Sequence, residues 1–180
     1  FAAKMSLTSY QEYKSVILLA VCWAWTFSIA TLLTFIGPKA AKNLRDDDFY
    51  AVLTVGIFVI GNAVCNIPSS PIFHRYGRMG GFLIGTLNLL LGGALGAIAV
   101  ATESLGLLFF ASFVIGFGVG MGQFYRFAAI ELASAQNKGW AVTTVLMGGC
   151  VAAFFGPTMG LLSKDMFNSE YSGGVFMMTV

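Results

Sequence analysis

The stretch at residues 69–81 reads SSPIFHRYGRMGG, and long apolar runs flank it on both sides. It holds two arginines, the single histidine of the chain, a proline and three glycines. Lipid cannot satisfy the backbone hydrogen bonds or the charges of such a segment, so a polar turn between two apolar runs must lie at a membrane surface. The stretch therefore predicts two membrane-crossing helices joined by a turn at one face of a bilayer.

The composition of the whole chain supports a membrane location. Of its 180 residues, 57% are hydrophobic and 10% are charged, whereas about 25% of the residues of a soluble domain are charged. Its apolar runs reach the length of about twenty residues that a membrane-spanning helix needs. The net charge of +2 and the lack of a basic cluster interleaved with aromatics argue against a nucleic-acid partner. We expect an integral membrane protein surrounded by lipid.

The alternation of apolar and polar segments predicts an all-α fold, a polytopic helix bundle. A polar N-terminal segment at residues 1–15 precedes a transmembrane region at 16–180. We expect five complete spans and the truncated start of a sixth, at residues 16–36, 49–67, 80–101, 105–128, 140–162 and 171–180. Gly37-Pro38 should end the first span, because proline removes a helical hydrogen bond. Residues 37–48 should form a charged loop whose three aspartates favour the start of the next helix.

The distribution of lysine and arginine predicts the orientation in the membrane, because cytoplasmic loops carry an excess of both. With the N-terminus in the cytoplasm, six basic residues lie inside and four outside. The six are Lys4, Lys14, Arg75, Arg78, Arg126 and Lys138.

Arg126 ends the fourth span and is predicted to belong to a charge cluster. Arginine this close to the apolar region is costly unless it is paired or hydrated, and Glu131 is its nearest acidic neighbour in sequence. We expect Glu131 to bridge Arg126 to Arg75 and Arg78 in the turn at residues 69–81. The alternative is that these arginines bind lipid headgroups.

Small residues at intervals of four allow helices to approach closely in lipid. Gly148, Ala152, Gly156 and Gly160 have this spacing, with Pro157 beside them, and are expected to pack helices together. The glycine string at 116–122 lacks the spacing of a nucleotide-binding loop. One histidine and three scattered cysteines offer neither a metal site nor a nucleophile–base pair, so we expect no metal, no cofactor and no enzymatic activity.

Three degenerate motifs resemble those of the major facilitator superfamily. Ser70–Met79 is similar to the signature G-x-x-x-D-R-x-G-R-R/K between spans two and three: Arg75, Gly77 and Arg78 match, while Ser70, His74 and Met79 differ. The connection after span four resembles R-F/Y-x-x-x-E-x-x-P-x-x-x-R-G. It matches at Arg126, Phe127, Glu131, Lys138 and Gly139, and Ser134 replaces the proline. Gly156-Pro157-x-x-Gly160 resembles the G-P-x-x-G motif of span five.

The resemblance implies the N-terminal half of a secondary transporter that moves a small solute by alternating access, with the C-terminal half as its partner. It implies a gating cluster at Arg75, Gly77, Arg78, Arg126 and Glu131. Polar residues that could face the solute cavity are Trp25, Ser28, Asn62, Asn66 and Gln123, although each could simply fill a helix contact. The alternative function is a non-transporting structural subunit of a larger membrane complex, respiratory or photosynthetic, with other membrane subunits as partners.

Overall fold

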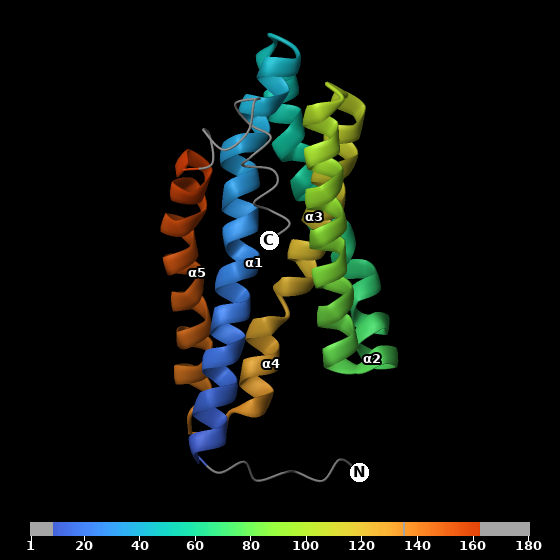
Figure 1. The fold of residues 1–180 in the computed structure, drawn as a ribbon. Helices are drawn as coiled ribbons and strands as arrows, with labels where there is room; N and C mark the ends of the chain where they lie inside the picture. The colour runs from blue at the N-terminus through green and yellow to red at the C-terminus, as the bar shows by residue number, and fades with distance from the viewer. Residues whose placement is uncertain (1–8, 135, 163–180) are drawn as a thin grey trace.

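The computed structural model describes residues 9–134 and 136–162, with the side chains of residues 11–134, 136–154 and 158. This part of the chain forms five helices: α1 (Ser9–Leu44), α2 (Asp48–Ala101), α3 (Leu105–Gly122), α4 (Tyr125–Leu132) and α5 (Lys138–Leu162). They build an elongated bundle of roughly parallel rods, without a strand among the described residues (Figure 1). The all-α prediction is confirmed for this part. The predicted sixth span at 171–180 lies outside the described residues.

The helices have the length and apolar character of membrane spans. Among the described residues, α1, α2 and the run from α3 into α4 are long and apolar enough to cross a bilayer, and Lys138–Phe154 of α5 is a shorter apolar helix. A membrane helix bundle is therefore confirmed, while the exact number of spans stays a prediction.

α1 is the central helix, and it packs against different neighbours along its length. Its C-terminal half contributes Leu33 and Ile36 to a buried cluster with Phe58 of α2 and Ile115 of α3. Its N-terminal half contributes Val16, Ala20 and Trp23 to a second buried cluster, which is completed by Tyr125, Ala129, Ala133, Ala141 and Val145 from α4, α5 and the segment between them. α1 thus connects the α2–α3 pair to the α4–α5 pair.

The predicted end of the first span at Gly37-Pro38 is wrong. α1 continues through Pro38 to Leu44, which leaves a short non-helical corner before α2 where a charged loop was expected. Pro38 removes one helical hydrogen bond, but the turns beyond it are held by packing. Ala40 and Ala41 are buried against Ala99 and Leu108 in a third apolar cluster. As predicted, the aspartates start the next helix, since the Asp47 carboxylate accepts a hydrogen bond from the Phe49 amide at 2.9 Å.

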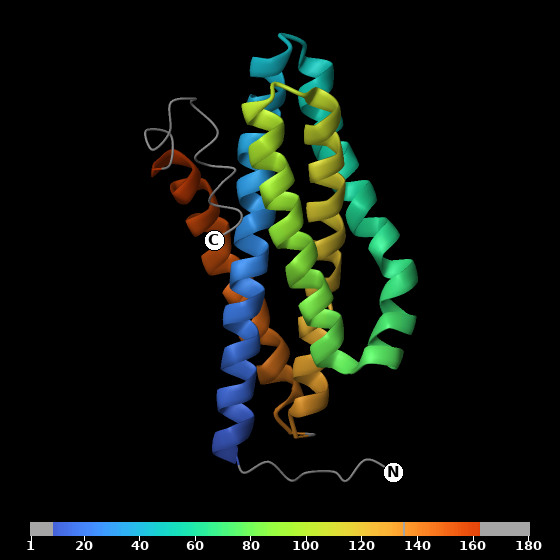
Figure 2. The same cartoon turned by 45° about the vertical axis from the view of Figure 1, so that its right-hand side comes forward.

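α2 contains the predicted turn between two spans, but that turn is much tighter than a polar loop. The backbone is helical through Pro68, Pro71 and the motif residues, and it leaves helical geometry at Gly77, where φ is 71° and ψ is 178°. Glycine alone adopts this region readily, because it has no Cβ. In Figure 2 the chain descends along the first arm of α2 (residues 48–76), reverses at Gly77, and returns along the second arm (residues 78–101). The expected loop is therefore a helix reversal at one residue.

The first arm of α2 is in close contact with α3 at two glycines. A Cβ added at Gly61 would lie 2.3 Å from the Phe113 carbonyl oxygen, and one added at Gly116 would lie 2.1 Å from the Phe58 carbonyl oxygen. No side chain fits at these two positions, so the helix backbones touch directly. Small residues perform this role in membrane bundles because lipid supplies no hydrophobic drive for association.

The fourth predicted span, 105–128, is not one uninterrupted helix. α3 ends at Gly122 and α4 begins at Tyr125, with a break at Gln123 and Phe124. α5 then runs back along α1: a Cβ on Gly148 would lie 2.5 Å from the Ala20 carbonyl oxygen, and Ala152 is buried. These two residues take the predicted packing role. Gly156, Pro157 and Gly160 fall within α5, but their side-chain surroundings lie outside the described residues.

Candidate functional site

An ion pair joins the reversal of α2 to α4 at one end of the bundle. The Arg78 guanidinium, one residue after Gly77, contacts the Glu131 carboxylate near the end of α4. The Arg78 side chain is 41% exposed and that of Glu131 is 66% exposed. An exposed pair contributes about 0.2–1 kcal/mol, so this contact can bias the position of α4 without locking it. In Figure 2, α4 and the α2 reversal lie at the lower end of the bundle.

A group of aromatic rings packs the residues that flank the α2 reversal against the start of α4. The Phe82 ring stacks on Tyr125 with centroids 4.2 Å apart, and the Phe73 ring lies 5.2 Å from Phe82 and 4.9 Å from Phe124. These rings come from both arms of α2, from α4 and from the break before it. Aromatic pairs at such distances add roughly 0.5–1.5 kcal/mol beyond the burial of their area. This group was not predicted from the sequence, although Phe73 lies inside the motif.

Arg126 does not join the cluster as predicted. Its guanidinium donates through Nη2 to the Gln123 side-chain oxygen and through Nε to the Gln123 carbonyl oxygen at 3.5 Å. It also lies over the Trp23 ring, 5.8 Å from the centroid. Among the described residues, the ion pair of Glu131 is with Arg78 and not with Arg126. Of the two predicted links of Glu131, the one to the turn at residues 69–81 is present and the one to Arg126 is not.

Helix geometry explains the difference. Residues five apart on an α-helix are separated by about 140° around its axis, whereas residues three apart share a face. Arg126 and Glu131 are five apart, and Gln123 and Arg126 are three apart. Glu131 therefore points to the α2 reversal, and Arg126 points to α1. The spacing of these residues in the sequence thus indicated which of them share a helix face.

The remaining motif residues lie around the reversal. The Arg75 guanidinium is 5.7 Å from the Tyr76 ring centroid, and its side chain is exposed. Neither Arg75 nor His74 has an ion-pair partner among the described residues. Gly77 supplies the backbone geometry of the turn, and a Cβ added there would have nothing within 4 Å. Of the predicted cluster, the structure thus brings together Arg78 and Glu131.

The five predicted cavity residues are spread over three elements. Trp25 is 55% exposed on α1, and the Ser28 hydroxyl donates to the Ala24 carbonyl at 2.9 Å. The Asn66 side chain donates to the Asn62 carbonyl at 3.3 Å, and both lie on the first arm of α2. Gln123 holds Arg126. No hydrogen bond joins these five side chains to one another in the described part of the chain, and their role in a solute cavity stays a prediction.

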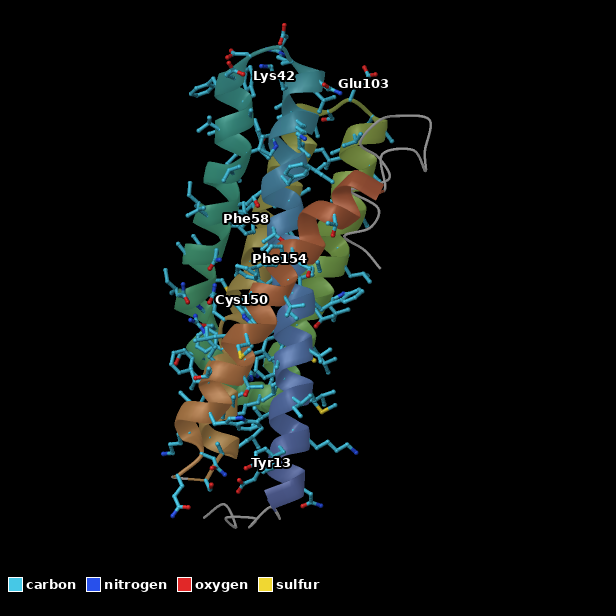
Figure 3. All side chains as sticks on the ribbon, turned by 90° about the vertical axis from the view of Figure 1, so that its left-hand side faces the viewer. Tyr13, Lys42, Phe58, Glu103, Cys150 and Phe154 are labelled. Carbon is cyan, nitrogen blue, oxygen red and sulfur yellow. The ribbon has the colours of Figure 1, made fainter. Side chains whose placement is uncertain are left out.

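The opposite end of the bundle carries a second exposed ion pair. Lys42 Nζ lies 2.8 Å from the Asp48 carboxylate, across the corner between α1 and α2. Figure 3 shows Lys42 and Glu103 at the upper end and Tyr13 at the lower end. The Arg78–Glu131 pair therefore lies at the end where α1 begins, and the Lys42–Asp48 pair lies at the end where α1 finishes.

The sequence matches known membrane transporters over nearly its whole length. The profile of a family described as "Sugar (and other) transporter" matches residues 2–178. A riboflavin transporter of Brucella anthropi is 28% identical over 172 residues, which is 91% of this chain and 41% of the relative. An uncharacterized MFS-type transporter of Bacillus subtilis is 29% identical over 151 residues, 79% of this chain and 34% of the relative.

A plant protein extends the set of similar sequences. A probable plastidic glucose transporter of Arabidopsis thaliana is 28% identical over 114 residues, which is 63% of this chain and 21% of that protein. This chain thus spans less than half of the length of each of these relatives. The relatives are named as transporters and not as enzymes.

Proposed function

Because the chain belongs to the sugar (and other) transporter family of the major facilitator superfamily, we propose that it is the N-terminal half of a secondary transporter that moves a small solute by alternating access. The observation that carries this proposal is the Arg78–Glu131 pair between the α2 reversal and α4. The C-terminal half would be its partner across the solute pathway. The named relatives make transport a better proposal than a structural subunit.

The ion pair has the strength that a gate requires. A transporter has to switch between two states. The contacts that keep one state closed can therefore contribute little more free energy than the free-energy difference between the two states. A contribution of about 1 kcal/mol shifts a two-state equilibrium roughly fivefold. The pair at the end where α1 begins would close that end, which we expect to be cytoplasmic, and its rupture would accompany opening.

Charge reversal tests the gate without knowledge of the solute. Ala133 lies two residues after Glu131 and is buried against α1 and α5. In a protein whose three native cysteines are replaced, a cysteine introduced by Ala133→Cys should therefore react slowly with maleimide. Arg78→Glu or Glu131→Arg places like charges together and should raise the alkylation rate about five- to thirtyfold, for a change of about 1–2 kcal/mol. The double swap should restore slow alkylation.

The same variants should change transport by the full-length protein in proteoliposomes. Radiolabelled riboflavin and glucose are suitable probes, because the relatives are named for these solutes. We expect each single reversal to lower the initial uptake rate and the swap to recover most of it. Double-swap protein that stays as reactive at position 133 as the single variants would contradict a gating role for the pair.

A further inference from the structure

The second arm of α2 has two unlike faces. Its glycine face packs on α3: a Cβ added at Gly85 would lie 2.7 Å from the Met121 Cβ, and one added at Gly92 would lie 2.5 Å from the Ile115 Cγ1. In Figure 1 this arm, in light green, lies on the side of the bundle away from α5. The opposite face carries an outer stripe of apolar side chains that are between 50% and 78% exposed: Met79, Leu83, Leu87, Leu90, Leu91 and Ile98.

The outer stripe has the length and the chemistry of a surface against lipid chains. Met79 and Ile98 are about 28 Å apart along a helix, and the hydrocarbon core of a bilayer is about 30 Å thick. The polar side chains beside the stripe, Thr86 and Asn88, donate to main-chain carbonyls one turn earlier at 3.0 Å and 2.8 Å. These two donors are therefore satisfied within the helix, as lipid contact requires.

A cation lies just before the start of the outer stripe. Arg75 precedes Met79 by four residues, its side chain is exposed, and its guanidinium is 5.7 Å from the Tyr76 ring centroid. Tyr76 is itself exposed, and tyrosine is enriched at the level of lipid headgroups because its ring is apolar and its hydroxyl is polar. The α2 reversal thus places a guanidinium where an apolar, lipid-length surface ends.

The charges around the reversal favour an anion. No acidic residue of α2 follows Asp48. At the end of the bundle that holds the reversal, Glu131 is paired with Arg78, and no ion pair joins Glu12 to Arg75 in the described structure. Near this end, a headgroup phosphate would be attracted. The opposite end would repel it, because four acidic residues lie there: Asp46, Asp47, Asp48 and Glu103.

We propose that an anionic phospholipid binds to the second arm of α2, with its phosphate at Arg75 and an acyl chain along the outer stripe from Met79 and Leu83 onward. The paired donors of a guanidinium fit two phosphate oxygens. A phospholipid matches both parts of this surface, the apolar length and the cation at one end. The inference goes beyond the proposed function, because it requires a bilayer and not the gate.

Lipid quenching of a fluorescent label tests the inference in a bilayer. Leu83→Cys is introduced into the full-length protein without other cysteines, labelled with bimane and reconstituted into proteoliposomes. Phosphatidylglycerol and phosphatidylcholine, each with the same nitroxide near the top of one acyl chain, are compared as quenchers. We expect phosphatidylglycerol to associate about fivefold more strongly, the effect of one basic residue near an anionic lipid. Arg75→Gln should bring the two lipids to about equal association, and Arg75→Lys should keep most of the preference.

Two controls locate the effect at Arg75. A label at Ile98→Cys, at the far end of the outer stripe, should report no preference for phosphatidylglycerol and no change in Arg75→Gln. Arg45 is the matched arginine at the opposite end of the bundle, since it is also exposed and also lies 5.7 Å from a tyrosine ring centroid, that of Tyr50. Arg45→Gln should leave the preference measured at Leu83→Cys unchanged.

Several outcomes would overturn the inference. Weak quenching by both lipids at Leu83→Cys would show that protein covers the stripe, either the C-terminal half or a second copy. Equal association of the two lipids, or a preference that persists in Arg75→Gln, would exclude phosphate binding at Arg75. If gel filtration shows that Arg75→Gln is misfolded, salt replaces the variant: about 1 M salt shortens the Debye length to about 3 Å and should abolish the preference, and its persistence would likewise overturn the inference. None of these outcomes affects the charge-reversal test of the gate.

Discussion

At the scale of single residues, backbone contact between α2 and α3 depends on glycines that cannot be replaced. Gly116→Ala would place a methyl group 2.1 Å from the Phe58 carbonyl oxygen, so the helices must separate. We expect a loss of roughly 1–3 kcal/mol, the usual cost of overpacking, in unfolding by SDS titration. Gly56→Ala is the control on the first arm of α2, which carries Phe58, because nothing lies within 4 Å of the Gly56 Cβ position. Equal stability of the two variants would disprove direct backbone contact.

Individual residues also show what the sequence could and could not predict. The contact between Arg78 and Glu131 followed from two motifs that must meet at one membrane surface, and it is present. The partners of Arg126 were predicted wrongly, because distance along the chain was used in place of direction around the helix. Its contact with Trp23 could not be predicted, since it depends on how α1 crosses the break between α3 and α4.

At the scale of helices, the reversal of α2 rests on one backbone geometry. Gly77→Ala puts a Cβ on a residue with φ of 71° and ψ of 178°, which costs about 1–3 kcal/mol. We expect lower thermal stability and faster alkylation of Ala133→Cys, because the reversal positions Arg78. Gly139→Ala is the control at the same end, with open space around its Cβ position and no strained φ. A Gly77→Ala protein as stable as this control would contradict the prediction.

Helix boundaries were harder to predict than helix existence. Pro38, Pro68 and Pro71 all read as signals to stop a helix, yet each lies inside one. Local propensity was overridden by packing between distant segments, as with Ala40 and Ala41 against Ala99. Conversely, the break at Gln123 and Phe124 has no proline and was missed. Contacts between distant segments decide these helix boundaries, and such contacts cannot be read from a single sequence.

At the scale of the whole molecule, the charged segments lie at the two ends of the helix bundle. Tyr13 packs edge-on against Trp140 at 4.6 Å, so α1 and α5 begin at the same end, where Arg78 meets Glu131. With Cys22, Cys65 and Cys150 replaced, a cysteine introduced at His74 or Lys138 should react with a membrane-impermeant maleimide only in permeabilised cells. One introduced at Asp46 should react in intact cells, because the excess of basic residues marks the cytoplasmic side.

The orientation experiment has two ways to fail. Labelling of His74→Cys and Lys138→Cys from different sides would contradict the bundle itself. Labelling of both in intact cells would reverse the proposed orientation and leave the bundle standing. The sequence alone predicted the bundle and this grouping of charges, because both follow from the exclusion of polar groups from lipid. The role of the predicted cavity residues stays a prediction, because a solute pathway in this family forms between two halves.

The continuation of α1 past Pro38 has a practical consequence. Residues 37–44 add about 12 Å of helix beyond the predicted apolar span, and the Lys42–Asp48 pair joins this extension to the start of α2. We expect the corner at residues 45–47 to lie outside the lipid, where an antibody fragment could bind without touching a membrane-facing helix. Such a fragment would serve as a marker for particle alignment in electron cryo-microscopy, because the described helices are joined by short connections.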